Sequence, residues 1–354
     1  MAVDSYKTKK GIRYRYRFMY ENVPQQKGDF TTAKEAKHAE AVKLNKLKYH
    51  GTSDIYFNNL VDDYLNDIVN YIKESTYITK LNIIGKHIKP LFTDMPISEV
   101  RPIDIRNWQG KIKNKINPLT NKPYADTYLK TIQNQLSAIF NYAVKFYDLP
   151  ENPVPIAGSL GKKNRDTFEF WTLAEFKKYI SVVDDEQSLL LVFILFYSGM
   201  RIGEAIGLTW KNIDFENNII DVKTTKQRIN GRWVVTTPKT KKSIRPIAMP
   251  AVAMAMLAQW KKMQYKPKKT DFVFITDRTV VAKHITKYSK KSEVKRIRVQ
   301  DLRHSHASLL VELGVNIIEI SERLGHEKVQ TTIDTYIHLY PNKQKEIAKK
   351  LELI

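Results

Sequence analysis

The pattern of hydrophobic and polar residues changes character along the chain. Between Gly11 and Tyr20, hydrophobic and mostly aromatic residues alternate strictly with polar ones, which predicts a strand with one buried face. The other face carries three arginines that could meet phosphates: Arg13, Arg15 and Arg17. After a turn-rich segment, Thr31 or Thr32 can cap a helix that runs to about residue 49. The pattern predicts a small sheet backed by a helix, and a strand with merely solvated arginines is the alternative.

Residues 56 to 148 show helical periodicity instead. One stripe at helical spacing is formed by Phe57, Leu60, Val61, Tyr64, Leu65 and Ile68. Lysines lie between such stripes, which predicts an all-α domain with a basic surface. Residues 149 to 167 are rich in proline, glycine and basic side chains, a composition that interrupts both helix and strand and predicts a basic linker. In this linker, Lys162 and Lys163 are candidate contacts to a DNA backbone.

Residues 168 to 354 contain both segments with helical periodicity and segments with the alternation that is typical of strands. Thr172 and Glu175 form a capping-box pattern at the start of a helix, and a second, strongly apolar helix is predicted over 187 to 198. Short strands are predicted over 219 to 222, 232 to 237, 243 to 248 and 272 to 275, and the remainder after residue 250 is mostly helical. This region predicts a mixed α/β domain that is mainly α.

Composition narrows the class of partner. The 354 residues suffice for two or three domains, and 59 lysines and arginines against 37 aspartates and glutamates give a net charge of +22. A positive charge spread along the whole chain favours a polyanionic partner, although a merely basic soluble protein remains the alternative. Without cysteines there are no disulfides or thiolate metal sites. The N-terminus does not resemble a signal peptide, and the most apolar run, Leu189 to Tyr197, is too short to span a bilayer, so we expect a cytoplasmic, DNA-associated protein without a membrane role.

Groups that can bind and attack a phosphate gather between Val299 and Tyr340: Arg303, His304, His306, His326 and Tyr336. Taken singly, each has an ordinary structural interpretation. His306 and Tyr336 share helical faces with hydrophobic residues, which is typical of packed core side chains. His326 follows a glycine that can end a helix, where a histidine is usually just exposed. The order and spacing of these residues are more informative than any one of them.

Three motifs occur in a specific order: S-G-M-R-I-G-E-A-I-G-L at 198 to 208, L-R-H-S-H-A from Leu302, and L-G-H ten residues before the tyrosine of T-Y-I-H-L. Together they resemble the tyrosine recombinase family of phage and transposon integrases. The resemblance implies an arm-type DNA-binding domain at 1–52, a helical core-binding domain at 56–148, the basic linker at 149–167 and a catalytic domain at 168–354. It also implies double-stranded DNA with core and arm sites, a homotetramer on that DNA, and directionality or DNA-bending factors as partners.

The resemblance assigns roles to individual residues. Arg201 and Arg303 would bind the non-bridging oxygens of the scissile phosphate, since a guanidinium presents paired donors to such oxygens. Lys239, in the turn T-P-K-T-K-K, would protonate the leaving 5′ oxygen, with Lys241 and Lys242 as alternatives. His326 would donate a hydrogen bond to the phosphate. The nucleophile would be Tyr336, forming a 3′-phosphotyrosyl bond without a metal ion or nucleotide cofactor.

One position departs from the family pattern. Where the family writes H-x-L-R, this chain has Gln300 three residues before Arg303, and glutamine cannot shuttle a proton. We expect His304 to point off a different side of the helix and not to replace the missing imidazole. A catalytically impaired or non-catalytic DNA-binding protein that keeps the fold is therefore the alternative function. A dimer resolvase and a topoisomerase-like relaxer are alternatives within the same chemistry.

Overall fold

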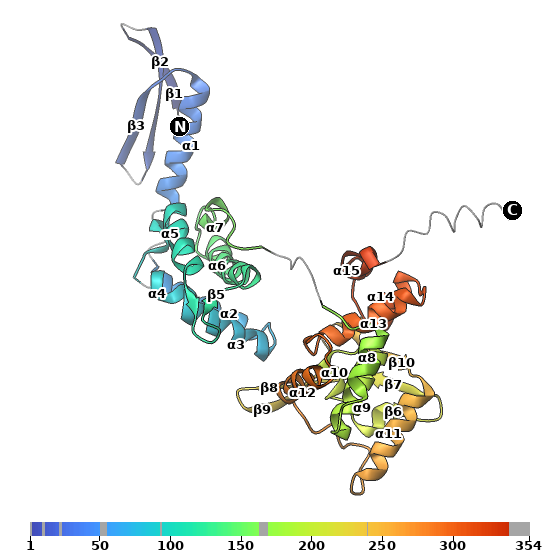
Figure 1. Cartoon of the computed structure of the whole chain (residues 1–354). Helices are drawn as coiled ribbons and strands as arrows, with labels where there is room; N and C mark the ends of the chain where they lie inside the picture. Colours follow the sequence, from blue (N-terminus) through green and yellow to red (C-terminus); the bar gives the residue numbers. More distant parts are fainter. Residues whose placement is uncertain are drawn as a thin grey trace, which may run out of the picture. The chain divides into compact units, whose positions relative to one another are not determined.

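A computed structural model of the chain describes residues 2–8, 11–20, 23–49, 55–92, 94–162, 169–238 and 240–339. The chain divides into two compact units, Met1–Arg165 and Asp166–Ile354 (Figure 1). Within the described ranges, no helix is long and apolar enough to cross a membrane.

The first unit begins with a three-stranded antiparallel sheet in the order β1-β2-β3. Its elements are β1 (Ala2–Thr8), β2 (Gly11–Tyr20), β3 (Val23–Phe30) and α1 (Ala33–Tyr49), and α1 packs against all three strands. Tyr16 and Phe18 are buried as the alternation predicts. Thr32 caps α1, because its Oγ1 accepts a hydrogen bond from the backbone N–H of Glu35 at 3.1 Å.

β3 is a strand that the sequence pattern did not predict, because Pro24 and Gly28 indicate a turn. β3 lies at the edge of the sheet, where a proline with no N–H to donate is tolerated. The register of β2 and β3 shifts between Tyr14 and Tyr16, and the nearby Asp29 has a positive φ of 66°. Pro24 and Gly28 therefore belong to an irregular edge strand and not to a turn.

The rest of the first unit is helical, as the sequence predicts. Its elements are α2 (Phe57–Ile68), α3 (Glu74–Ile83), the π-helical turn η1 (Ile84–Ile88), α4 (Lys89–Phe92), η2 (Ile97–Glu99), α5 (Pro102–Lys113), the short strands β4 (Ile116–Asn117) and β5 (Lys122–Pro123), α6 (Asp126–Phe146) and α7 (Pro153–Ile156). All but one of the predicted α2 stripe are buried, the exception being the partly buried Ile68. This stripe packs with Ile132, Leu136 and Ile139 of α6 in one core.

Much of the predicted linker belongs to this core, so the predicted boundary at residue 149 is wrong. Leu149, Val154 and Leu160 are buried among the helices, and proline at the first helical position starts α7. The carbonyl of Gly158 accepts hydrogen bonds from two buried glutamine side chains, Gln109 at 2.9 Å and Gln133 at 2.7 Å. Proline and glycine here shape a packed turn, and within the predicted linker only residues 163–167 lie outside the described ranges.

The second unit is mixed α/β and mainly helical, as predicted. Its helices are α8 (Leu173–Ile180), α9 (Glu186–Ser198), α10 (Ile202–Ala205), η3 (Trp210–Asn212), η4 (Lys241–Ser243), α11 (Ala251–Met263), α12 (Arg278–Lys291), α13 (Asp301–Glu312), α14 (Ile317–Leu324), α15 (Val329–Tyr336) and η5 (Ile337–Leu339). Apolar α9 is buried on nearly every side, and Phe196 stacks on Phe176 of α8 with ring centroids 3.7 Å apart. Such an all-round apolar helix forms the centre of the core.

The strands of the second unit form two small antiparallel sheets. One has the order β10-β7-β6, made of β10 (Arg245–Ala248), β7 (Ile219–Val222) and β6 (Ile213–Asp214), and the other pairs β8 (Thr225–Ile229) with β9 (Arg232–Thr236). β8 was not predicted from the sequence. At the strand predicted over 272 to 275, the structure has only an isolated bridge between Thr209 and Phe272.

Candidate active site

The first arginine motif begins where α9 ends. Gly199 closes α9 in the left-handed region, with φ 65°, and its N–H donates to the carbonyl of Leu195. A Cβ on Gly199 would lie 2.5 Å from Cδ2 of His306 on α13. Glycine meets both conditions, so α9 and α13 approach each other closely here. The carbonyl of Gly199 in turn accepts a hydrogen bond from Nη1 of Arg303 at 2.9 Å, which ties the two predicted arginine motifs together.

Arg201 is held by a buried carboxylate three residues later. Its Nη1 donates to Oε1 of Glu204 at 2.8 Å, and its backbone N–H donates to Oε2 at 3.0 Å. Oε2 also accepts a hydrogen bond from Nη2 of Arg245 at 3.2 Å. Burial alone would raise the pKa of Glu204, but Arg245 and Arg201 outweigh burial and hold this pKa below its usual value. Glu204 therefore orients two guanidinium groups, those of Arg201 and of Arg245, and Arg245 is a site residue that the sequence analysis missed.

Arg303 is a buried cation with unused hydrogen-bonding capacity. The residue is only 4% exposed, and among the described residues its Nη2 has no hydrogen-bond partner. The pKa of Arg303 is lowered to about 9, mainly by burial and also by the neighbouring Arg201 and Arg245, although Glu204 and Tyr336 act to raise it. At neutral pH the group still carries its charge. Leaving such a donor unpaired costs free energy, so the site is prepared to accept an anion.

His326 joins this cluster from the loop after α14. Gly325 ends α14 with φ 67°, and a Cβ there would lie 2.9 Å from the carbonyl of Lys242. Nδ1 of His326 lies 2.7 Å from Oγ1 of Thr332. The pKa of His326 is lowered to about 3, mainly by burial and also by the positive charges of Arg303, Arg201 and Arg245. The imidazole is therefore neutral at physiological pH, and it is partly buried instead of being merely an exposed loop residue.

Tyr336 ends α15 and is nearly completely buried, at 1% exposure. Its hydroxyl oxygen lies 2.7 Å from Nδ1 of His304 on α13. Burial raises the pKa of the Tyr336 hydroxyl well above its usual value, although the positive charge of Arg303 lowers it. The helices α13, α14 and α15 lie together in Figure 1, and their small core includes Ile320, Leu324 and the Tyr336 ring.

The expectation that His304 points away from the site is wrong. The direction of the His304 side chain follows from its position relative to Gln300, four residues earlier, and not from that of its neighbour Arg303. Residues four apart on a helix lie one above the other, because each residue turns the chain by about 100°. Gln300 stands at the N-cap of α13, half-buried and without a capping hydrogen bond from its side chain. His304 follows one turn later and reaches the tyrosine.

Asp301 pairs with an arginine that precedes the helix. Its two oxygens accept hydrogen bonds from Nε and Nη2 of Arg298 at 2.9 and 2.7 Å. His306 is a packed core histidine, as predicted. Nε2 of His306 accepts from Nε of Arg323 at 3.0 Å, so the protonated Nδ1 donates to the carbonyl of Phe196 at 2.8 Å.

Lys239, the predicted general acid, lies outside the described residues. Lys241 belongs to η4 and Lys242 is exposed. The turn that contains them does not close a hairpin, because β9 pairs with β8 whereas β10 pairs with β7. This segment therefore crosses from one sheet to the other, and it contacts the His326 loop through the carbonyl of Lys242.

Arg245 could have been found from the sequence. Alternation along R-P-I-A places Arg245 and Ile247 on the same inward face of β10, and both are buried. A buried arginine needs an anionic partner, and Glu204 supplies it at 3.2 Å. With Arg201, Arg303 and Arg245 around this one carboxylate, the cluster carries excess positive charge. Among the described residues, no group of three or more histidines and acids is placed to hold a metal ion.

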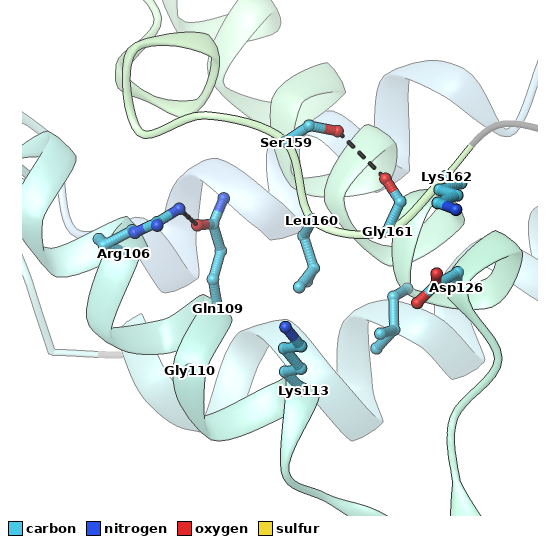
Figure 2. Close-up of a pocket in the computed structure, with 10 residues that line it drawn as sticks. Arg106, Gln109, Gly110, Lys113, Asp126, Ser159, Leu160, Gly161 and Lys162 are labelled. Atoms are coloured by element: carbon cyan, nitrogen blue, oxygen red, sulfur yellow. Dashed lines mark hydrogen bonds between the residues drawn. The ribbon is translucent and has the colours of Figure 1, made fainter.

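The first unit contains a separate basic cavity of about 430 Å³ (Figure 2). Arg106 and Lys113 of α5 line it together with Lys162 from the segment after α7. Asp126 is the acidic residue among its lining side chains. Lys162, a predicted DNA contact, thus lies in a cationic surface, and the other predicted contact in this segment, Lys163, lies outside the described residues.

The arginines of β2 are less available than the sequence suggests. Arg15 and Arg17 both form ion pairs with Asp4 of β1, each with a 3.0 Å contact to the same carboxylate oxygen. Arg13 lies opposite Tyr6 of β1 in the sheet. The arginine face is therefore partly neutralised from within the sheet, a feature that could not be foreseen because β1 was not predicted.

Comparisons with known proteins agree with this geometry. Residues 169–343 match the model of the phage integrase family, and residues 56–118 match the N-terminal SAM-like domain of phage integrases. The ICEBs1 integrase of Bacillus subtilis is 34% identical over 340 residues, which cover 91% of this chain and 90% of that protein. The integrase of Staphylococcus phage L54a is 27% identical and covers 88% of this chain and 96% of its own length.

The fold is also that of solved integrases. The Tn1549 transposon integrase, solved as residues 82–397 in complex with a circular intermediate DNA, matches with a TM-score of 0.71 at 20% identity. The match covers 85% of this chain and 100% of that one. The chain therefore belongs to the tyrosine recombinase family of phage and transposon integrases and is a site-specific recombinase.

Proposed function

We propose that this recombinase cuts and rejoins double-stranded DNA through a 3′-phosphotyrosyl bond to Tyr336, and so integrates or excises a mobile element. One observation carries the proposal. A buried arginine, Arg303, lies in the same cluster as the Tyr336 hydroxyl, and its Nη2 has no hydrogen-bond partner among the residues that the structure describes. A phosphate bound there would supply the missing partner and would lie beside the oxygen that attacks it.

The other site residues would take the roles that the family resemblance implies for them. Arg201, fixed by Glu204, and Arg303 would hold the non-bridging oxygens of the phosphate. His326 is neutral, and the tautomer with a proton on Nε2 can donate to the same phosphate. Lys239 would protonate the 5′ oxygen as it leaves. These cations would neutralise the charge that metal ions neutralise in many other phosphoryl-transfer enzymes.

A phosphotyrosyl bond accounts for rejoining without an external energy source. The phenol has an ordinary pKa of about 10, so its oxygen can leave when the 5′ hydroxyl of a DNA strand attacks. The energy of the broken phosphodiester is then kept in the protein–DNA bond. Strand exchange between two duplexes would involve four copies of the chain, as a homotetramer, in the cytoplasm.

The remaining domains would place the site on DNA. Residues 1–52 would bind distal arm sites, and residues 56–148 would bind the core site together with Lys162 and Lys163. The Tn1549 integrase is in complex with DNA, which supports a duplex as the partner of the similar fold here. Directionality or DNA-bending factors would select integration or excision.

A second function keeps some support from Gln300. Without an imidazole at this position, the chain could bind attachment sites but cleave them slowly, acting as an impaired or architectural member of the family.

A nicked suicide substrate separates the two functions. The nick lets a short 5′ fragment diffuse away, so an active enzyme stays bound covalently to the DNA. We expect an SDS-resistant adduct from the full chain and from Tyr340→Phe, the nearest tyrosine in sequence, but none from Tyr336→Phe. Binding of intact core DNA should be similar for all three proteins. Binding without any adduct from the full chain would instead support the architectural function.

A further inference from the structure

The hydroxyl that is proposed to attack the phosphate already has a hydrogen-bonding partner on α13. We propose that His304 is a catalytic residue that accepts the proton of Tyr336 during strand cleavage and returns it during rejoining, in place of the imidazole that is absent at Gln300. This inference rests on the proposed role of Tyr336 as nucleophile.

The geometry is that of a general base. Nδ1 of His304 and the hydroxyl oxygen of Tyr336 are 2.7 Å apart, within the range in which a proton is transferred directly. Their ring centroids lie 5.6 Å apart, so the imidazole also contacts the phenol ring. Both side chains are held in packed helices, α13 and α15, and the contact does not depend on a loop.

The surroundings keep His304 in its basic form. Burial lowers the pKa of His304, the cations of Arg303 and Arg298 lower it further, and Asp301 raises it. Tyr336 and His326 are two further ionisable groups that lie close to it. The imidazole is therefore neutral at physiological pH and can accept a proton on Nδ1 when Nε2 carries the ring proton. Burial makes the Tyr336 hydroxyl harder to ionise, which increases the need for a base.

Each step balances. In cleavage, the Tyr336 oxygen forms a bond to phosphorus and its proton moves to Nδ1 of His304, while the bond from phosphorus to the 5′ oxygen breaks. That oxygen takes a proton from the general acid proposed at Lys239. In rejoining, the 5′ hydroxyl attacks the phosphotyrosine and returns its proton to the neutral amine of the general acid proposed at Lys239, while the departing phenolate recovers its proton from the imidazolium. Asp301, which raises the His304 pKa, favours the imidazolium in the interval between the two steps.

His304→Asn tests proton transfer separately from positioning. An asparagine can offer an oxygen near the place of Nδ1 but cannot take up the proton. In single-turnover cleavage of the nicked substrate by the full chain, we expect a loss of about 10² to 10⁴-fold with unchanged DNA affinity. The rate of the unsubstituted protein should fall as acid protonates His304, and this acid limb should disappear in the variant. The matched control is His284→Asn, which replaces a partly buried histidine of α12 outside the site.

Two further variants guard against a purely structural effect. Gln300→His in the His304→Asn background should restore part of the rate, because it places an imidazole one helical turn earlier on the same face. Replacing Tyr336 by a fluorotyrosine with a more acidic phenol should shrink the penalty of His304→Asn, since a more acidic nucleophile needs less help from a base. A misfolded variant would gain from neither change.

The inference is overturned if His304→Asn keeps the rate and the pH profile of the unsubstituted chain while Tyr336→Phe forms no adduct. It is also overturned if the rate loss is unaffected by both the fluorotyrosine and the Gln300→His change. If Tyr336→Phe still forms the adduct, the proposed nucleophile is wrong, and the proposal for His304 fails with it. The two failures are therefore distinguishable.

Discussion

Replacing Glu204 with glutamine tests whether one carboxylate holds the cationic cluster together. Glu204 is 2% exposed and accepts hydrogen bonds from Arg201 at 2.8 Å and from Arg245 at 3.2 Å. Glutamine keeps the shape but removes the charge, and its amide N–H group would face an arginine. Arg201 is partly exposed and can turn towards water, whereas Arg245 is buried and cannot.

The expected loss in the free energy of unfolding follows from the burial of Arg245. Removing one partner of a buried ion pair leaves an uncompensated buried charge and costs about 3–5 kcal/mol. Arg245 keeps its hydrogen bonds to the carbonyls of Arg323 at 2.7 Å and Ser243 at 2.9 Å, so we expect the lower part of that range, about 3 kcal/mol. An exposed matched control, Glu216→Gln in the turn between β6 and β7, should change the free energy of unfolding by less than about 0.5 kcal/mol.

The same carboxylate predicts a pH dependence. The pKa of Glu204 is lowered in the folded chain from its ordinary value of 4.5, so the folded state binds the proton more weakly than the unfolded state does. The stabilisation from Glu204 is therefore fully present above about pH 4.5 and is lost as pH falls through the lower, folded-state pKa. Glu204→Gln should lack this loss because it has no proton to bind.

Urea unfolding followed by tryptophan fluorescence measures the stability of the second unit, which contains Glu204. Four tryptophans lie in this unit: Trp171, Trp210, Trp233 and Trp260. The midpoint should fall for Glu204→Gln at neutral pH, and the difference from the unsubstituted protein should shrink in acid. Equal stability of Glu204→Gln and Glu216→Gln at neutral pH would refute the reasoning. Such a result would mean that the ion pair of Glu204 and Arg245 contributes no more to the free energy of unfolding than the neutral contact of glutamine with Arg245.

Three further predictions concern other parts of the chain. Gly199→Ala should destabilise the second unit by about 2–5 kcal/mol, since it adds strain at positive φ and a Cβ that overlaps a buried histidine, and an unchanged urea midpoint would contradict this. Asp4→Asn should free Arg15 and Arg17, tightening arm-DNA binding and steepening the slope of log K against log salt by up to about 0.9 per new phosphate contact. An unchanged slope would remove these arginines from the arm interface. Deleting residues 1–52 should weaken binding to arm sites but spare cleavage of a short core site, and loss of core cleavage by a folded truncation would show that the segment is not an independent module.

Local periodicity predicted those elements whose neighbours in space are also neighbours in sequence. The α2 stripe, the alternation in β2 and the cap of α1 at Thr32 each depend on a few adjacent residues, and the structure confirms them. The core position of His306 follows from helical spacing in the same way. Motif order identified the family because it records several distant positions at once.

Features that depend on contacts between residues distant in sequence were either not predicted or predicted wrongly. β3 reads as a turn because proline and glycine interrupt its pattern, and only its place at the sheet edge makes it a strand. Residues 149–162 read as a linker until the hydrogen bonds from Gln109 and Gln133 to Gly158 are known. The contact of His304 with Tyr336 joins α13 to α15, so the pattern within either helix alone does not predict it.

The most direct test of the central claim is to locate the bond between protein and DNA. After trapping on a nicked core site and removal of most of the DNA by nuclease, trypsin should release residues 329–343, which contain both Tyr336 and Tyr340, so fragmentation of the peptide in the mass spectrometer must decide between them. The account predicts a nucleotide joined through its 3′ phosphate to Tyr336. Attachment to Tyr340, or to any other residue, would contradict it.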